Sequence, residues 1–322
     1  MGELQSISTW WMWTGFTIFV IIMLGVDMFA LGRKGAHKVG AKEALVWSII
    51  WFALAMLFGG LLWGWLDHTA GRAVADTKVM EYLTGYLLEK TLAMDNIFVF
   101  VMIFSYFAVP LEFQKRILIY GVLGAIILRA LMILLGAWLI AQFHWVLYLF
   151  GAFLLITGIK MFIFAEHEPD LAKNPLLNWL RNHFRITENY HGDKFWVMQN
   201  GVRWFTPMFL VLVLIEFSDV IFALDSIPAI FAVTNDPFIV FTSNIFAILG
   251  LRALYFLLAD MADRFHLLKY GLAVVLIFVG TKMLIVEWYK IPVAISLAVV
   301  ISVLGISMLL SILSTRKTKQ IS

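Results

Sequence analysis

The chain has 322 residues, of which 62% are hydrophobic and 14% are charged, and its formal net charge at pH 7 is +3. The mean hydropathy of +0.91 lies outside the range of soluble globular domains and indicates a polytopic membrane protein. The chain contains no cysteine, which excludes disulfides, thiolate metal ligands and cysteine nucleophiles.

Nine segments are apolar enough to cross a bilayer, which takes about 20 residues of helix. The fold class is therefore predicted to be all-α, with about nine transmembrane helices. The first apolar run follows Glu3 and no basic region, so we interpret it as a retained helix and not as a signal peptide. The predicted spans are residues 9–31, 44–66, 80–109, 116–141, 143–165, 206–233, 237–259, 267–288 and 291–313.

The positions of the basic residues predict the orientation of these spans. If the N-terminus lies outside, sixteen Lys and Arg residues fall in cytoplasmic segments and three, Arg72, Lys78 and Lys290, fall outside. Positive charge in short loops marks the cytoplasmic side of a membrane protein. We therefore expect the N-terminus outside and the C-terminus in the cytoplasm.

The longest loop, residues 166–205, is then cytoplasmic. Its stretch "NPLLNWLRNHFR" places four apolar residues on one helical face, which predicts a short helix lying in the membrane interface. Asn200 and Gly201 stand between two apolar runs, which predicts a β-hairpin. The apolar face of the helix consists of Leu176, Leu177, Leu180 and Phe184.

Residues 80–165 and 206–288 resemble each other. Residues 148–163 align with 270–285, and Arg129 aligns with Arg252. Each copy contains three predicted spans, and an odd number of spans reverses direction, so the copies are predicted to be inverted repeats. Such repeats are typical of secondary transporters, whose site lies at the repeat interface. The alignment also matches Glu89 with Asp219, Asp95 with Asp225, and Asn96 with Ser226.

The remaining segments complete the predicted organisation. Residues 1–79 hold two N-terminal helices, residues 166–205 form the loop, and residues 289–322 form a C-terminal helix with a basic tail.

The first spans of the two repeats contain Glu89, Asp95, Glu216, Asp219 and Asp225, and each such charge costs about 2.5–3.5 kcal/mol to insert. Arg129 and Arg252 lie at matching depths and are predicted to form supporting ion pairs, whereas Lys160 and Lys282 lie near span ends and can snorkel. One interpretation is that the carboxylates and arginines form ion pairs that only stabilise the packing of the helices. The other interpretation is that the excess negative charge binds a cation. The predicted cation ligands are Glu89, Asp95, Asn96, Glu216, Asp219, Asp225 and Ser226.

Helical geometry constrains these ligands. Glu216 and Asp219 share a face at 100° per residue, whereas Glu216 and Asp225 lie 180° apart on a straight helix. Pro228 removes one backbone donor next to Asp225, which predicts a discontinuous sixth span. By symmetry, a break is also expected in the third span.

The ligand types indicate which ion would bind. The seven histidines lie in loops or at span ends, so the site offers oxygen ligands, which suit Mn²⁺, Mg²⁺ or Ca²⁺ better than Zn²⁺ or Cu⁺. Met94 could add a soft ligand, although a single Met is more often packing. Protons are a second candidate, because buried carboxylates relay them. No nucleophile–base pattern, HExxH motif or P-loop is present, so we expect neither an enzyme nor an ATP-driven pump.

At these residues the chain resembles the TerC family of integral membrane proteins. The resemblance rests on "GRKGAH" (32–37), "GRAVAD" (71–76), "LTGYLLEKTLAMDNIFVF" (83–100), "EFSDVIFALDSIPAIFAV" (216–233) and "DPFIVFTSNIFAILGLRALYFLL" (236–258). It implies a transporter-like protein of the bacterial inner membrane, of the wider LysE-type superfamily, that is linked to manganese homeostasis. The acidic motif positions of the family fall on Glu89, Asp95, Glu216, Asp219 and Asp225.

The leading functional hypothesis is a secondary transporter that exports Mn²⁺, with protons as a candidate counter-ion. We expect no permanently bound cofactor and no nucleic-acid partner. The alternative is a membrane platform that delivers metal to exported proteins or acts in the redox or tellurium stress response. Without cysteine, a redox role would be indirect. The transport direction, the coupling ion, the choice among Mn²⁺, Mg²⁺ and Ca²⁺, and the oligomeric state stay open.

Overall fold

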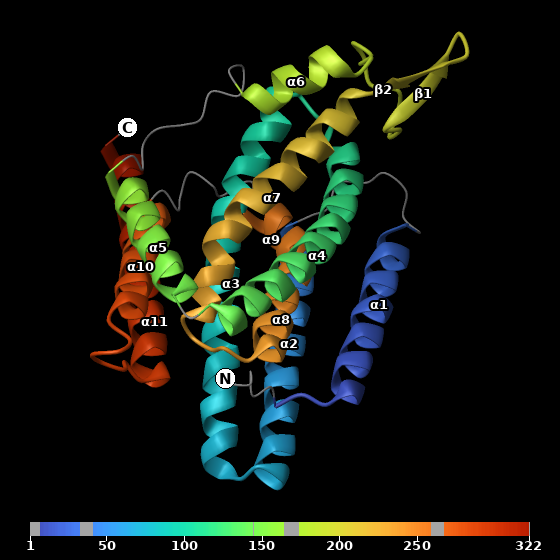
Figure 1. Cartoon of the computed structure of the whole chain (residues 1–322). Helices are drawn as coiled ribbons and strands as arrows, with labels where there is room; N and C mark the ends of the chain where they lie inside the picture. Colours follow the sequence, from blue (N-terminus) through green and yellow to red (C-terminus); the bar gives the residue numbers. More distant parts are fainter. Residues whose placement is uncertain (1–6, 33–40, 144, 164–173, 259–266, 322) are drawn as a thin grey trace.

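The computed structural model describes residues 7–32, 41–143, 145–163, 174–258 and 267–321, which form a helical bundle with one β-hairpin (Figure 1). The elements are α1 (Trp10–Gly32), α2 (Ala41–Thr69), α3 (Arg72–Tyr106), α4 (Leu111–Gln142), α5 (Val146–Ile163), α6 (Pro175–His183), β1 (Trp196–Gln199), β2 (Val202–Phe205), α7 (Pro207–Phe231), α8 (Pro237–Leu249), α9 (Leu251–Leu258), α10 (Leu268–Leu284) and α11 (Val293–Ile321).

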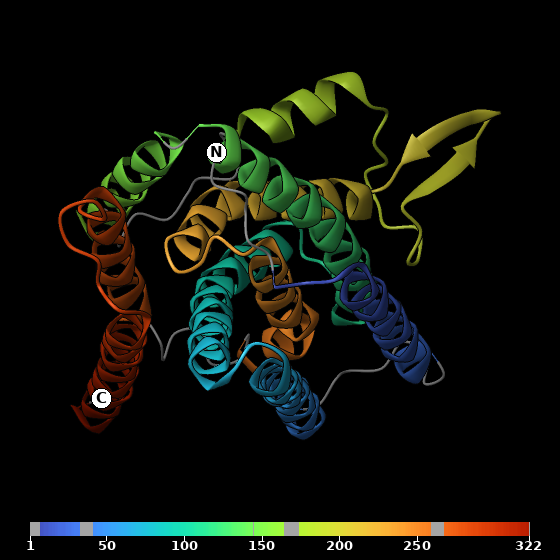
Figure 2. The ribbon, with the colours of Figure 1, turned by 60° about the horizontal axis from the view of Figure 1, so that its bottom comes forward.

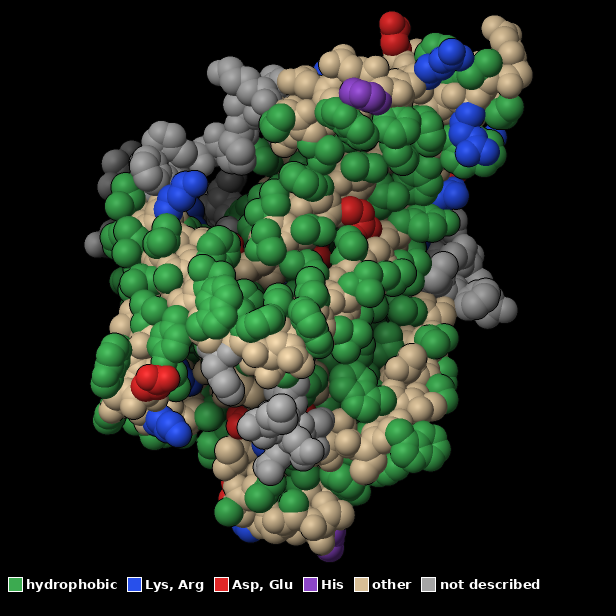
Figure 3. All heavy atoms as spheres, in the orientation of Figure 1, with side chains coloured by type: hydrophobic (Ala, Val, Ile, Leu, Met, Phe, Trp, Pro, Cys, Tyr) green, Lys and Arg blue, Asp and Glu red, His purple; other side chains and the backbone are tan. Residues whose placement is uncertain are grey.

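The all-α class is confirmed, and a helix lies over each of the nine predicted spans in the described part of the chain. Five of these helices, α2, α4, α5, α7 and α11, are long and apolar enough to cross a membrane, and the bent pair α8–α9 would make a sixth. Hydrophobic side chains cover most of the flank seen in Figure 3. The count of nine transmembrane helices stays a prediction.

Helix α3 lies at the centre of the bundle (Figure 2). Its residues contribute to three separate hydrophobic clusters: Tyr82 and Tyr86 pack with α1, α2 and α8, Ile97 packs with α4, α6 and α7, and Leu88 and Leu92 pack with α10 and α11. The middle of α3 is covered by these neighbours, so a charged group there has little access to water and needs partners from the surrounding helices.

The predicted breaks in the third and sixth spans are wrong. Helix α3 is continuous, and α7 runs through Pro228 to Phe231. A proline removes a single helical hydrogen bond. Pro228 lies in the last turn of α7, where its own carbonyl still accepts from Ala232 N at 3.0 Å. Only three residues of α7 follow the proline, so the helix ends close after it and is not interrupted there.

The break occurs instead at Gly250, between α8 and α9, which are bent by 41°. A Cβ added at Gly250 would lie 2.5 Å from Lys90 Nζ and 3.2 Å from Trp51 Cβ. The glycine therefore allows α2 and α3 to pack closely against the break. Lys90 Nζ donates to the carbonyl of Ala247 at 3.4 Å, which satisfies an acceptor near the end of α8.

The predicted short helix forms as α6, with Asn174 as its cap. Its apolar face, however, packs against the protein and does not lie in the membrane interface as predicted. Leu177 and Leu180 are buried in a cluster that includes Met208 and Val211 of α7. The beginning of α7 offers apolar surface directly beneath α6, and this surface takes the place of lipid. The predicted hairpin is confirmed, with Asn200 and Gly201 at positive φ angles of 51° and 75°.

Helices α5 and α10 pack closely through glycines. A Cβ at Gly158 would lie 2.9 Å from Ala273 O, and a Cβ at Gly280 would lie 2.6 Å from Leu155 N and 2.8 Å from Gly151 O. The repeat alignment pairs Gly158 with Gly280, Gly151 with Ala273, and Leu155 with Ile277. The added Cβ at Gly158 also meets Ile277 N at 2.9 Å. Under the repeat alignment, the contact of Gly158 with Ala273 corresponds to that of Gly280 with Gly151. The contact of Gly158 with Ile277 likewise corresponds to that of Gly280 with Leu155. Corresponding contacts of this kind are expected between two inverted repeats, which stay a prediction.

Gly280→Ala is expected to destabilise the protein by about 1–3 kcal/mol, because the new methyl group meets backbone that cannot move without separating the helices. Gly60→Ala in α2 is the matched control, since a Cβ there meets nothing within 4 Å. Thermal unfolding in detergent compares the two variants. Equal melting temperatures would show that α5 and α10 are not packed as described.

Candidate functional site

A charged centre lies buried in the middle of the bundle and joins α3, α4, α7 and α8. Arg129 of α4 is 1% exposed and forms a bidentate pair with Asp219 of α7, with Nη2 donating to Oδ1 at 2.8 Å and Nε donating to Oδ2 at 3.1 Å. Arg129 Nη1 also forms an ion pair with Glu89 of α3, which is 0% exposed. The guanidinium therefore bridges two carboxylates that the repeat alignment matched to each other.

Amide and hydroxyl groups complete this network. Asn244 of α8 donates from Nδ2 to Glu89 Oε2 at 3.0 Å, and Asn96 of α3 donates from Nδ2 to Asp219 Oδ1 at 3.4 Å. Arg129 Nη1 donates to Ser226 Oγ and to Asn244 Oδ1, each at 3.4 Å. Hydrogen bonds to charged groups are about twice as strong as neutral ones, so these contacts offset part of the cost of burying the charges.

A small cavity of about 30 Å³ adjoins the charged centre. A cavity needs about 10–15 Å³ to hold one water molecule, so this cavity has room for a water molecule or a small ion. Asn96 Oδ1 and Asp225 Oδ1 are buried and accept no hydrogen bond from the described residues, and Thr157 of α5 lies close to the Asp225 carboxyl. The lining residues are Glu89, Leu92, Asn96, Arg129, Met161, Phe222, Asp225, Ser226 and Leu276.

Four of the seven predicted cation ligands line this cavity: Glu89, Asn96, Asp225 and Ser226. Asp219 does not line it and instead pairs with the guanidinium. Within the described side chains, no group of three or more acidic or histidine residues has the geometry of a metal site. The cavity thus collects oxygen atoms of mixed type and not a cluster of carboxylates.

Of the other predicted residues, Glu216 and Arg252 lie away from the cavity. Glu216 lies against Gly124 of α4 and does not line the cavity, in agreement with the 180° separation from Asp225 on a straight helix. The backbone of Asp95 belongs to α3, but its side chain lies outside the described residues. Arg252 is buried in α9 at 5% exposure.

Sequence reasoning missed three residues of this region: Asn244, Thr157 and Met161. Asn244 is the only amide in α8 and follows Thr242 and Ser243, so the polar run at residues 242–244 of a mostly apolar helix could have indicated it. Thr157 and Met161 belong to α5, where a threonine and a methionine are ordinary constituents of an apolar helix. Only the packing of α5 against α7 brings them to Asp225.

A larger pocket of about 540 Å³ lies at the predicted outer end of the bundle and includes Lys78, Glu81 and Lys282. Lys282 is 8% exposed and donates to Ser296 Oγ at 3.0 Å, so the prediction that it snorkels to the surface is wrong. A hydroxyl of α11 lies within its reach, which removes the need to extend to water. Phe231, which lines this pocket, lies about 9 Å along α7 from Asp225 at 1.5 Å per residue.

An all-helical bundle with an apolar surface and a charged centre defines a polytopic integral membrane protein. The profile of the integral membrane protein TerC family matches residues 74–319. The chain therefore belongs to the TerC family, and the resemblance inferred from its motifs is confirmed.

Several curated relatives are similar over nearly the whole chain. The "Putative membrane-bound redox modulator Alx" of Salmonella typhi and that of Escherichia coli (strain K12) are each 55% identical over 308 residues, 96% of this chain and 96% of theirs. The "Uncharacterized membrane protein STKORF319" of Myxococcus xanthus is 46% identical over 316 residues, 98% of this chain and 96% of its own. No solved structure matches the chain.

Proposed function

We propose that this protein is a secondary transporter that exports Mn²⁺ from the cytoplasm across the inner membrane. The observation that carries the proposal is the small cavity beside Arg129, which is lined by Asp225, Glu89 and the free Oδ1 of Asn96. A buried acceptor without a donor costs about 1–3 kcal/mol. A cation in the cavity would offset this cost for two acceptors at once.

The charge balance favours a divalent ion. Glu89, Asp219 and Asp225 carry three negative charges when ionised, and Arg129 supplies one positive charge. Two negative charges stay uncompensated within this group of four side chains. One divalent cation would neutralise them, whereas one proton would leave a net charge in the membrane.

The donor atoms favour manganese among divalent ions. Carboxylate, amide and hydroxyl oxygens suit Mg²⁺, Ca²⁺ and Mn²⁺, and the family resemblance points to Mn²⁺. Met161 also lines the cavity and offers a thioether, a softer ligand that Mg²⁺ and Ca²⁺ do not use. Asn96 and Asp225 belong to different copies of the predicted inverted repeat, which is the usual position of a transport site.

A second candidate function follows from the name of the relatives in Salmonella typhi and Escherichia coli, "Putative membrane-bound redox modulator Alx". This chain has no cysteine, so thiol chemistry of its own is excluded. A role in redox or tellurium stress, or in metal delivery to exported proteins, would then act through the metal that the membrane centre handles.

Flux measurements in liposomes test the proposal. Purified protein is expected to carry Mn²⁺ down an imposed gradient, with Mg²⁺ or Ca²⁺ as competitors and without a preference for Cu⁺. An imposed pH gradient should change the rate if protons are the counter-ion. Protein-free liposomes provide the control. If the ion flux into protein-free liposomes equals that into protein-containing liposomes for every ion, transport is excluded. The role in metal delivery or stress response is then favoured.

A further inference from the structure

The hairpin β1–β2 exposes apolar side chains on both of its faces. Trp196 and Met198 of β1 are 48% and 59% exposed, and Val202 of β2 is 38% exposed. In the register of the hairpin, Trp196 and Met198 share one face, and Val202 belongs to the other. A two-stranded hairpin is marginally stable in water. Uncovered apolar groups of this size on such an element indicate that something else contacts them.

Basic side chains accompany these apolar groups. The guanidinium of Arg203 lies 4.6 Å from the ring centre of Trp196, and neither Arg203 nor Lys194 forms an ion pair with a described residue. Arg116 is paired with Asp193, and its guanidinium lies 5.6 Å from the ring centre of Phe195. The first turns of α4 and the hairpin segment contain two carboxylates, Glu112 and Asp193, and four basic residues, so their net charge is positive. The basic residues are Lys115, Arg116, Lys194 and Arg203.

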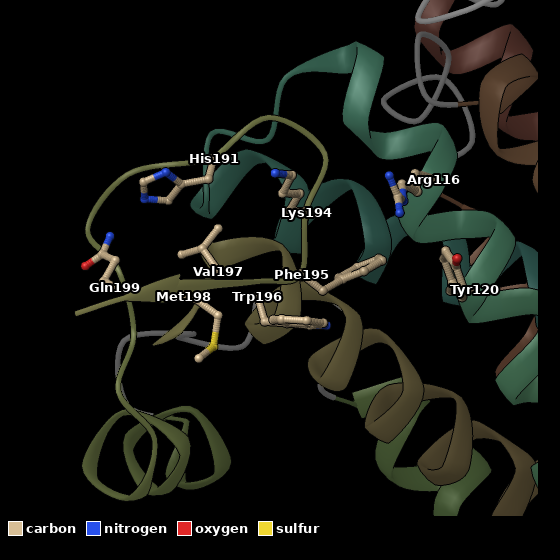
Figure 4. Close-up of a pocket in the computed structure, with 9 residues that line it drawn as sticks. All are labelled: Arg116, Tyr120, His191, Lys194, Phe195, Trp196, Val197, Met198 and Gln199. Carbon is tan, nitrogen blue, oxygen red and sulfur yellow. The ribbon is translucent and has the colours of Figure 1, made fainter. Parts of the chain in front are cut away.

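A cavity of about 820 Å³ connects the hairpin to helix α4. Figure 4 shows Arg116 and Tyr120 on α4 facing Phe195, with Lys194 between Arg116 and the strand. His191 and residues 196–199 form the opposite side. The cavity is large enough for a polar group bigger than a single ion, and it is open to the surroundings of the protein.

The position of this cavity identifies the kind of partner. Helix α4 is one of the helices that can cross the membrane, and its residues Leu111 and Tyr120 are 50% and 41% exposed beside the cavity. The apolar flank of the protein thus continues directly into the hairpin. Aromatic rings combined with Lys and Arg are typical of the depth of lipid headgroups. A protein partner would not require this continuity with the membrane surface.

We propose that the hairpin and the first turns of α4 form a binding site for acidic phospholipid headgroups. The phosphate lies between Lys194 and Arg203, and Trp196 and Met198 enter the boundary between headgroups and acyl chains. Arg and Lys are the common phosphate ligands in proteins. The site fixes the loop between the two predicted repeats to the membrane surface, a role that is independent of the transported ion.

The absence of native cysteine allows a direct test with single-cysteine labelling of the full-length protein. A spin label at Met198→Cys reports on the hairpin, and a label at Thr69→Cys, at the opposite end of the bundle, is the control. Nanodiscs contain phosphatidylcholine alone or an equal mixture with phosphatidylglycerol. The expected result is a several-fold loss of accessibility to a water-soluble nickel chelate at residue 198 when phosphatidylglycerol is present, with no change at residue 69.

Charge variants separate lipid recognition from simple apolar contact. The apparent affinity for phosphatidylglycerol, titrated into the labelled protein in detergent, should fall roughly 30-fold in the double variant Lys194→Gln/Arg203→Gln. The charge-conserving variant Lys194→Arg/Arg203→Lys should retain it. Three outcomes overturn the proposal: an equal response to phosphatidylcholine, full competition by inorganic phosphate, or protection that depends only on protein concentration. The last outcome would identify a second copy of the chain as the partner.

Discussion

Asp225→Asn is expected to abolish Mn²⁺ transport while leaving the helical bundle folded. Asp225 lines the small cavity, lies close to Thr157, and has one buried oxygen that accepts from no described residue. Asparagine has nearly the same volume but no charge. Its introduction reduces the negative charge beside the cavity without leaving a cation unpaired in this region. Thermal stability should therefore be unchanged or higher, since a buried charge is removed.

The measurements are expression, melting temperature and Mn²⁺ flux on the same purified samples. Asp67→Asn is the matched control, because Asp67 pairs with Arg72 at the predicted outer end of the bundle, far from the centre. Asp95→Asn should behave like Asp225→Asn if the symmetry-related aspartates serve one site. Full transport by the Asp225 variant would end the hypothesis of a cation site at this cavity. Loss of both flux and fold would favour a purely structural role.

Arg129→Gln is expected to have the opposite signature, with a large loss of stability. The guanidinium pairs with Glu89 and Asp219, and all three side chains are buried. Its removal leaves two carboxylates without their counter-charge in the interior of a membrane protein. Breaking a buried ion pair in this way costs about 3–5 kcal/mol. We expect a lower melting temperature and poor accumulation of the variant in the membrane.

A compensating variant makes this prediction specific. Adding Glu89→Gln and Asp219→Asn to Arg129→Gln removes the stranded charges, so the triple variant should recover much of the stability, although transport would stay impaired. Arg72→Gln is the control, because this arginine is 65% exposed in its surface pairs and should cost only about 0–1 kcal/mol. If the single Arg129 variant melts like the wild type, the charged centre is not a buried ion-pair network.

The variants Asp225→Asn and Arg129→Gln together distinguish the two interpretations that the sequence left open, a purely structural ion pair and a cation site. Glu89 and Asp219 serve the ion pair that locks α3, α4 and α7 together, as the structural reading required. Asp225, Asn96 and Glu89 line the cavity, as the cation reading required. The structure therefore contains the ion pair, with Glu89 in both groups, while cation binding at the cavity stays a proposal that the Asp225→Asn variant tests.

Much of the fold could be predicted because bilayer helices are encoded locally. A run of apolar residues forms a helix in lipid whatever it packs against, since its backbone must bond within itself. The hairpin at Asn200 and Gly201 was predictable for the same reason, because the turn depends on two residues with positive φ. The apolar face of α6 was misassigned because periodicity shows that a face is covered but not whether lipid or protein covers it.

By itself the sequence determined the all-helical membrane class, the family, and the residue types of the charged centre. Apolar runs and intramembrane charges can be recognised without knowing which helices pack against each other. Only the tertiary structure decided how those charges are used. It placed Arg129 between Glu89 and Asp219, continued α7 through Pro228, and brought Met161 to Asp225 while Glu216 stayed apart. Which buried groups meet depends on how helices distant in the chain pack, and no local pattern encodes that.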